Sequence, residues 1–145
     1  MSARSGRCLC GAVAFTCTPK PHDDGVHVDA CHCSMCRRLV GGPLLGVTLD
    51  GPPTIDNRES LTTYASSEWA ERQFCKVCGS NLFYQLKDGG LYTVIAGALD
   101  DDADAKLTVE IFVDEKPSYY DFSQVTTKMT GAEVMAAFAS GESAS

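Results

Sequence analysis

Closely spaced cysteines constrain this chain more than any other feature. It carries 8 Cys in 145 residues, and seven of them fall into a C-x-C doublet, a C-x-C-x-x-C triplet and a C-x-x-C doublet. In chain order, these residues are Cys8 and Cys10, then Cys31, Cys33 and Cys36, then Cys75 and Cys78. Thiols this close in sequence make poor disulfide partners for each other, but they converge readily on one small ion.

The N-terminal segment predicts where the protein is located, and the location in turn predicts the redox state of its thiols. Met1 to Arg7 is polar and basic, and no apolar stretch follows it, so we expect no signal peptide and a cytoplasmic protein. The cytoplasm keeps thiols reduced, which favours metal binding over a disulfide framework.

The grouped cysteines can be divided between two zinc sites, because zinc prefers four ligands in a tetrahedron. The two doublets together supply four thiolates, and we call this set the four-cysteine cluster: Cys8, Cys10, Cys75 and Cys78. A site of this kind is complete, so we expect it to hold a structural zinc. The triplet leaves one coordination position free, as catalytic zinc sites do, and we call it the three-cysteine cluster: Cys31, Cys33 and Cys36.

Spacing alone leaves another division open. Cys8 and Cys10 could close a site with Cys31 and Cys33 instead. The first division is favoured because the triplet needs only a very short loop closure to converge on one ion.

The number of thiolates indicates the chemistry of the three-cysteine cluster. An ion held by three thiolates is electron-rich and is a weaker Lewis acid than one held by neutral imidazoles. It suits holding an incoming thiol as thiolate better than making hydroxide. A thiol substrate would fill the free position and complete a set of four sulfurs.

Charge and hydropathy exclude two classes of partner. Lys and Arg number 12 against 19 Asp and Glu, which gives a net charge of -7. An acidic chain repels phosphate backbones, so we expect no nucleic acid as partner. The sequence has no apolar run near the roughly 18 residues of a membrane-spanning helix, so we expect no membrane partner.

The pattern of residues predicts one mainly β domain over residues 1–145, with its core in about 6–125. Strands are expected at 7–17, 26–30, 44–49, 61–65, 71–74, 81–86, 91–96 and 107–113. In the first of them, Cys17 shares an apolar face with Leu9, Val13 and Phe15, so we expect it to be a core residue. Residues 34–40 are expected to form a short helix that ends at Gly41, and residues 130–139 form a C-terminal helix.

Several segments resemble the glutathione-dependent formaldehyde-activating enzyme family, which includes centromere protein V. The resemblance lies in GRCLCGAV at 6–13, CHCSMCRR at 31–38 and RQFCKVCG at 72–79. AGALDD at 96–101 and KPSYYD at 116–121 are similar to the family's downstream segments. The match covers most of the chain, and the ordered set of three cysteine groups is specific.

The resemblance implies a fold of coiled antiparallel sheets, of the type shared with Mss4, and two zinc ions. By position, it places the four-cysteine cluster on the family's structural site and Cys31, Cys33 and Cys36 on its catalytic site. It also implies a carbon–sulfur lyase activity, run in reverse. Glutathione adds to formaldehyde or a related small aldehyde, and the product is S-(hydroxymethyl)glutathione.

Charged residues beside the triplet are candidates for substrate binding. Arg37 and Arg38 could each hold a substrate carboxylate through two parallel hydrogen bonds. His32 could give or take a proton, although in an extended C-x-C step its side chain points away from the metal.

Other functions fit the cysteine pattern less well. A zinc-bearing methionine-R-sulfoxide reductase needs a nucleophilic cysteine in its C-terminal part, but the last cysteine of this chain is Cys78. A nucleic-acid-binding zinc ribbon conflicts with the negative charge. The main alternative is a nonenzymatic zinc protein that binds glutathione or another thiol as a carrier or interaction module.

Overall fold

A computed structural model describes residues 2–140, and these residues are mainly β, as predicted. Contacts within the chain divide it into two compact units. Unit 1 comprises Met1–Val26 and Val47–Asp104, and unit 2 comprises His27–Gly46 and Ala105–Ser145. Each unit therefore combines segments that are distant in sequence. The organisation as one domain with a core in 6–125 stays a prediction.

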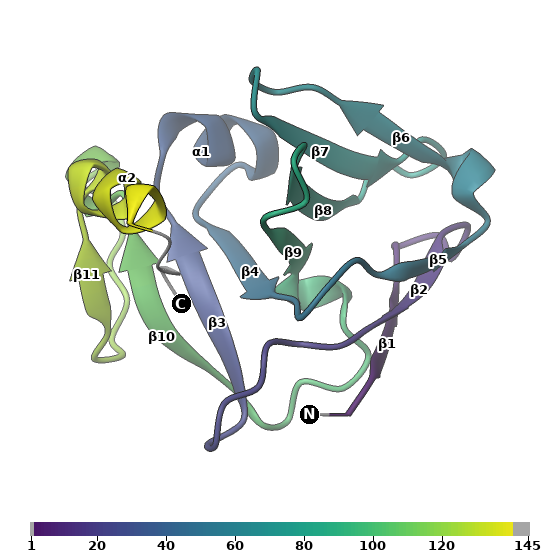
Figure 1. The fold of residues 1–145 in the computed structure, drawn as a ribbon, viewed down its shortest axis with the longest axis horizontal. Helices are drawn as coiled ribbons and strands as arrows, with labels where there is room; N and C mark the ends of the chain where they lie inside the picture. Colours follow the sequence, from purple (N-terminus) through teal and green to yellow (C-terminus); the bar gives the residue numbers. More distant parts are fainter. Residues whose placement is uncertain (1, 141–145) are drawn as a thin grey trace. The chain divides into compact units, whose positions relative to one another are not determined.

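Unit 1 contains a three-stranded antiparallel sheet. Its strands are β1 (Arg4–Arg7), β2 (Ala14–Cys17) and β5 (Thr54–Asp56), in the order β1-β2-β5 (Figure 1). The register places Gly6 opposite Phe15, and Phe15 opposite Ile55.

A second group of strands in unit 1 forms an antiparallel meander. It consists of β6 (Leu61–Tyr64), β7 (Ala70–Cys75), β8 (Asn81–Leu86) and β9 (Tyr92–Ile95), each paired with the next. Two 3-10 turns, η1 (Arg58–Ser60) and η2 (Ala96–Ala98), flank it. The ring of Phe15 meets the ring of Phe83 edge-on at 4.9 Å between centroids, so the two sheets of unit 1 share one core.

Unit 2 is built on a mixed sheet with the order β11-β10-β3-β4. Its strands are β3 (Val26–Cys31), β4 (Leu44–Thr48), β10 (Ala105–Ile111) and β11 (Thr127–Met129). β3 and β4 pair antiparallel, whereas β10 and β11 pair parallel. The predicted antiparallel pairing therefore holds for β3 and β4 but not for β10 and β11. Residues 112–126, which include η3 (Val113–Glu115), carry the chain back before β11 begins, and a parallel pair requires such a long connection.

Within the described part of unit 2 there are two α-helices, and both were predicted. In α1 (Ser34–Val40), the Sγ atom of Cys33 caps the N-terminus by accepting a hydrogen bond from the backbone N–H of Cys36. Gly41 ends the helix in the left-handed conformation, with φ of 85°. α2 (Gly131–Ala139) starts with a capping box in which Thr130 and Glu133 each bond the other's backbone N–H. No helix among residues 2–140 is long and apolar enough to cross a membrane.

The predicted strand over 7–17 is wrong in its middle. β1 ends at Arg7 and β2 begins only at Ala14. Residues 8–13 form a turn between them, in which the N–H of Cys8 donates to the carbonyl of Val13. Leu9 was expected to share a core face with Val13 but is 82% exposed, while Val13 is buried. Cys17 is buried as predicted. β5 and β11 were not predicted.

Candidate functional site

The four-cysteine cluster lies entirely in unit 1. Cys8 and Cys10 occupy the turn between β1 and β2, Cys75 ends β7, and Cys78 lies in the turn before β8. Their four Sγ atoms lie within 4.8 Å of one another. The Sγ atom of Cys10 is 3.7 Å from that of Cys8 and 3.8 Å from that of Cys75.

The backbone of the two turns is shaped around these sulfurs. The N–H of Val13 donates to Sγ of Cys8 at 3.3 Å, and the N–H of Val77 donates to Sγ of Cys75 at 3.4 Å. Gly11 and Gly79 both adopt positive φ, at 82° and 80°, which glycine allows without steric cost. Burial opposes the ionisation of Cys8, but hydrogen bonds from the N–H of Val13 and from neighbouring thiols outweigh it and lower the pKa of Cys8 below its usual value.

The spacing of the sulfurs fits zinc. A Zn–S bond of about 2.3 Å in a tetrahedron sets sulfur atoms about 3.8 Å apart. The separations of the Cys10 sulfur from those of Cys8 and Cys75, 3.7 and 3.8 Å, match that edge. The four residues can therefore hold a metal ion.

The three-cysteine cluster lies entirely in unit 2. Cys31 ends β3, Cys33 caps α1, and Cys36 lies in the first turn of α1. Their Sγ atoms lie within 4.8 Å of one another, and the part of the chain that the structure describes adds no fourth His, Cys, Asp or Glu to this group. The cluster can therefore supply three sulfur ligands to one ion.

The charge of this cluster is concentrated on Cys33. Hydrogen bonds from the Cys31 and Cys36 thiols, helped by the backbone N–H of Cys36, lower the pKa of Cys33 well below the usual range of a thiol. The hydrogen bonds of Cys31 with Cys33 and Cys36, together with burial, raise the pKa of Cys31. Before any metal binds, Cys33 thus ionises more readily than Cys31.

A buried hydrogen-bond network runs beside the triplet, and the sequence did not predict it. The His32 ring is fully buried, and its Nε2 atom lies 2.8 Å from Oε1 of Glu110. Its Nδ1 atom lies 2.6 Å from the hydroxyl of Tyr120. Because both ring nitrogens have partners, His32 does not act as a ligand of the triplet, which agrees with its expected direction away from the metal.

Glu110 is the ionised end of this network. Burial opposes its ionisation, but hydrogen bonds from Thr126 and His32 outweigh burial and lower the pKa of Glu110 below its usual range. Lys128 adds a positive charge 3.6 Å from Oε2 of the carboxylate. At the other end, burial raises the pKa of Tyr120, so its hydroxyl stays protonated near neutral pH.

The two predicted arginines occupy different environments on α1. Arg37 is half-buried, and its Nε donates to the carbonyl oxygen of His32 at 3.0 Å. Arg38 is exposed. Their role in substrate binding stays a prediction.

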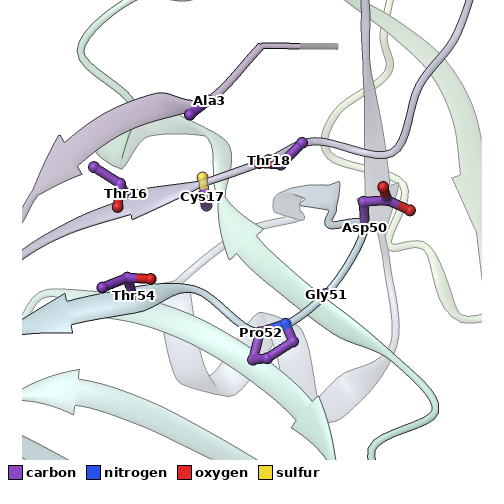
Figure 2. A pocket seen from close by; sticks show the side chains of 8 residues that line it. All are labelled: Ala3, Thr16, Cys17, Thr18, Asp50, Gly51, Pro52 and Thr54. Carbon is purple, nitrogen blue, oxygen red and sulfur yellow. The ribbon is translucent and has the colours of Figure 1, made fainter.

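A shallow cleft in unit 1 contains none of the candidate metal-binding or substrate-binding residues. Its volume is about 390 Å³, and Figure 2 shows the side chains that line it. They are Ala3, Thr16, Cys17, Thr18, Asp50, Gly51, Pro52 and Thr54. Burial raises the pKa of Cys17 to about 11, so its thiol stays protonated and behaves as a small core residue.

Fold and site together define a mainly β protein with two cysteine clusters that can bind metal ions. The family model described as glutathione-dependent formaldehyde-activating enzyme matches residues 3–115, which span parts of both units. The chain therefore belongs to the glutathione-dependent formaldehyde-activating enzyme family, as its cysteine motifs indicated.

Individual relatives agree with this assignment. A Schizosaccharomyces pombe protein named as an uncharacterized lyase is 32% identical over 136 residues, which are 93% of this chain and 96% of the relative. A Halomonas elongata protein with the provisional name of a glutathione-dependent formaldehyde-activating enzyme is 28% identical, over 80% of this chain and 78% of the relative. A crystal structure of a Rhodobacter sphaeroides protein superposes with a TM-score of 0.51 and 26% identity, over 72% of this chain and 99% of the other.

Proposed function

We propose that this chain is a zinc enzyme that adds a small thiol, glutathione in the first instance, to formaldehyde or a related small aldehyde. The reaction is that of a carbon–sulfur lyase run in reverse, and its product is S-(hydroxymethyl)glutathione. The observation that carries the proposal is the contrast between the clusters: one has four cysteines, and the other has three with no fourth ligand among residues 2–140.

The proposal assigns one zinc to each cluster, in a fold of the Mss4 type. Cys8, Cys10, Cys75 and Cys78 would hold a structural zinc that ties the turn after β1 to the end of β7. Support for zinc comes from the separations of 3.7 and 3.8 Å, which match a tetrahedron of thiolates. We place the protein in the cytoplasm, where its thiols stay reduced.

Cys31, Cys33 and Cys36 would hold the catalytic zinc. When bound there, zinc lowers the pKa of an incoming thiol and keeps it as a nucleophilic thiolate at neutral pH. Two of the three cysteines belong to α1 and its N-cap, so the helix would fix the position at which the sulfur of the substrate thiol binds. The new C–S bond forms at the aldehyde carbon, the carbonyl electron pair moves to oxygen, and that oxygen takes a proton. Holding the two reactants together supplies the gain in rate.

Arg37 and Arg38 would contact the carboxylates of glutathione. Both follow Cys36 directly on α1, so they lie one turn or less from the sulfur site. The hydrogen bond from Nε of Arg37 to the carbonyl of His32 fixes the plane of its guanidinium. This orientation suits paired hydrogen bonds to a carboxylate.

The test combines metal content, thiol binding and turnover. Purified protein should contain two zinc ions per chain, and Cys33→Ser should lower this number to one. Cobalt-substituted protein titrated with glutathione should show a new sulfur-to-cobalt absorption band that Cys33→Ser lacks. Adduct formation from glutathione and formaldehyde should exceed the background rate and fall to it in the same variant.

Cys17→Ser is the matched control, because Cys17 is buried and lies outside both clusters. Its zinc content and rate should equal those of the unaltered protein. Thiol binding without any gain in rate would support the nonenzymatic thiol carrier instead. A cobalt spectrum that glutathione leaves unchanged would refute both functions.

A further inference from the structure

We propose that Ser80 is a positioning residue for the metal ion of the four-cysteine cluster, and this proposal rests on the structural zinc of the proposed function. The Ser80 hydroxyl joins the two turns that supply the cysteines, because it bonds the backbone of the first turn and contacts a sulfur of the second. Through these contacts it holds the Cys78 sulfur in the position and the charge state that a metal ion requires.

The cluster is divided between two turns that are far apart in sequence. Cys8 and Cys10 lie between β1 and β2, whereas Cys75 and Cys78 lie at the junction of β7 and β8. Residues outside the ligand set orient the ligands and raise the affinity of a site for its metal. A residue that contacts both turns can therefore act on the whole site.

Ser80 is bonded to both turns. Its Oγ atom accepts a hydrogen bond from the backbone N–H of Leu9 at 3.0 Å, across 71 positions in sequence. The same Oγ atom lies 3.2 Å from Sγ of Cys78. The carbonyl oxygen of Ser80 accepts from the N–H of Cys75 at 2.9 Å. Ser80 is thus tied to both cysteines of its own turn and to the middle of the C-x-C doublet.

The direction of the bond to sulfur follows from metal binding. A cysteine that binds a metal ion is a thiolate, so it has no proton to donate. The Ser80 hydroxyl has one proton, and its oxygen already accepts from Leu9. The hydroxyl therefore donates to the Cys78 sulfur in the metal-bound form. The result is a chain of two hydrogen bonds that runs from the Leu9 N–H to the sulfur.

This chain of bonds favours metal binding in two ways. It fixes the Cys78 side chain, so less rotational freedom is lost when the sulfur binds the ion. It also stabilises negative charge on the sulfur, because a hydrogen bond to the charged form of a group favours that form. Hydrogen bonds in a chain polarise one another, so the bond from Leu9 strengthens the bond to sulfur.

A side-chain contact distinguishes Cys78 from the other cysteines of the cluster. Backbone N–H groups donate to the other three sulfurs, at 3.3 Å for Cys8 and at 3.4 Å for Cys10 and Cys75. A substitution leaves such backbone donors in place, whereas Ser80→Ala removes the hydroxyl at the Cys78 sulfur. The contribution of this hydroxyl to metal binding can therefore be measured by itself.

The first measurement is zinc affinity in the Cys33→Ser background, which isolates the four-cysteine cluster. Competition with a chelator gives the zinc dissociation constant. Ser80→Ala should raise this constant about 10–100-fold, and Ser80→Thr, which keeps the hydroxyl, should change it less than about threefold. Ser67→Ala is the matched control and should leave it unchanged. Ser67 is also half-buried in unit 1, and its hydroxyl accepts a backbone N–H, that of Ala70, at 3.1 Å.

The second measurement separates an effect on the sulfur from a general loss of structure. In the same background, cobalt bound to the cluster absorbs light by charge transfer from sulfur to metal. Without its hydrogen bond the Cys78 sulfur gives up an electron more easily, so Ser80→Ala should move the charge-transfer band to longer wavelength. Ser80→Thr and Ser67→Ala should leave the band in place.

Hydrogen exchange tests the other bond of Ser80 in a protein that keeps this residue. The N–H of Leu9 should exchange more slowly than that of an unstructured peptide, because the Ser80 hydroxyl accepts it. This protection is expected although Leu9 as a whole is 82% exposed. In Ser80→Ala the exchange of this N–H should become faster.

The outcomes separate this assignment from the proposed function. An unchanged zinc dissociation constant in Ser80→Ala would overturn the assignment while the proposed function stands. A larger constant with an unmoved cobalt band would mean that Ser80 only supports the turn, and it would overturn the assignment as well. An unprotected Leu9 N–H in the protein with Ser80 would do the same. Failure of the Cys33→Ser protein to bind zinc would refute the structural zinc of the proposed function and this assignment with it.

Discussion

Nε2 of His32 and Oε1 of Glu110 lie 2.8 Å apart, although 78 positions separate the two residues in sequence. The side chains are 0% and 3% exposed, so water does not compete for the bond. It joins the segment that carries the cysteine triplet to β10 within unit 2. The pair therefore stabilises the local fold on which the triplet depends.

Removing this carboxylate should destabilise the protein. Glu110→Ala leaves a fully buried His32 donor without an acceptor, and such a group costs about 1–3 kcal/mol. Denaturation by urea should show this loss in the free energy of unfolding. Glu59→Ala is the control, because Glu59 is exposed, and it should change the free energy by less than about 0.5 kcal/mol. Equal effects of the two substitutions would contradict a structural role for the pair.

Removing metal should affect the two clusters differently. Cys75 is fully buried in unit 1, and its cluster joins the turn after β1 to the end of β7. Cys75→Ser should therefore lose one zinc and lower the melting temperature, since metal binding contributes directly to folding. Cys33→Ser should also lose one zinc, but its melting temperature should fall less, because the triplet closes only a short local loop. Metal analysis and thermal unfolding check both, and a larger drop for Cys33→Ser would contradict the assignment of roles.

The sequence predicted the features that depend on neighbouring residues. The three-cysteine cluster follows from cysteines two or three positions apart, which must lie close together in any fold. The four-cysteine cluster also requires Cys10 and Cys75, 65 positions apart, to meet, and spacing alone left that pairing open. α1 was predictable because Gly41 follows its last turn and can adopt positive φ. α2 was predictable because Thr130 and Glu133 have the spacing of a capping box.

Features that depend on distant residues were missed. Nothing in the triplet motif indicates that Glu110 and Tyr120 surround His32, because these contacts arise only when residues 110–126 fold beside β3. The turn at Cys8 and Cys10 was mistaken for strand because alternating apolar residues fit a strand equally well. In the structure, the chain turns there so that the backbone N–H of Val13 bonds the Cys8 sulfur, and Leu9 stays 82% exposed.

Gly6 should tolerate no side chain. A Cβ atom at this position would lie 2.4 Å from the carbonyl oxygen of Ala98 and 2.4 Å from the Phe15 ring. The backbone of Ala98 cannot move without disturbing η2, so Gly6→Ala should cost about 1–3 kcal/mol, as overpacked cores do. Gly42→Ala is the control, because no heavy atom lies within 4 Å of its added Cβ. Urea denaturation of both variants checks the difference, and a neutral Gly6→Ala would show that the β1 strand is packed less tightly.

The start of α2 should weaken in acid. The backbone N–H of Thr130 donates to Glu133, and this bond, together with the Thr130 side chain, lowers the pKa of Glu133 below its ordinary value of 4.5. A carboxylate whose folded pKa is lowered stabilises the folded state above its unfolded pKa, and this contribution disappears as pH falls through the folded pKa. The difference in unfolding free energy between the unaltered protein and Glu133→Gln should thus be constant above about pH 5 and should shrink below about pH 4. The cysteine clusters take up protons in the same way in both proteins, so their contribution to the unfolding free energy cancels in this difference. Glu59→Gln is the control for losing an exposed carboxylate outside the helix cap. If the free-energy difference between the unaltered protein and Glu133→Gln did not change between pH 6 and pH 3, the capping role of Glu133 would be contradicted.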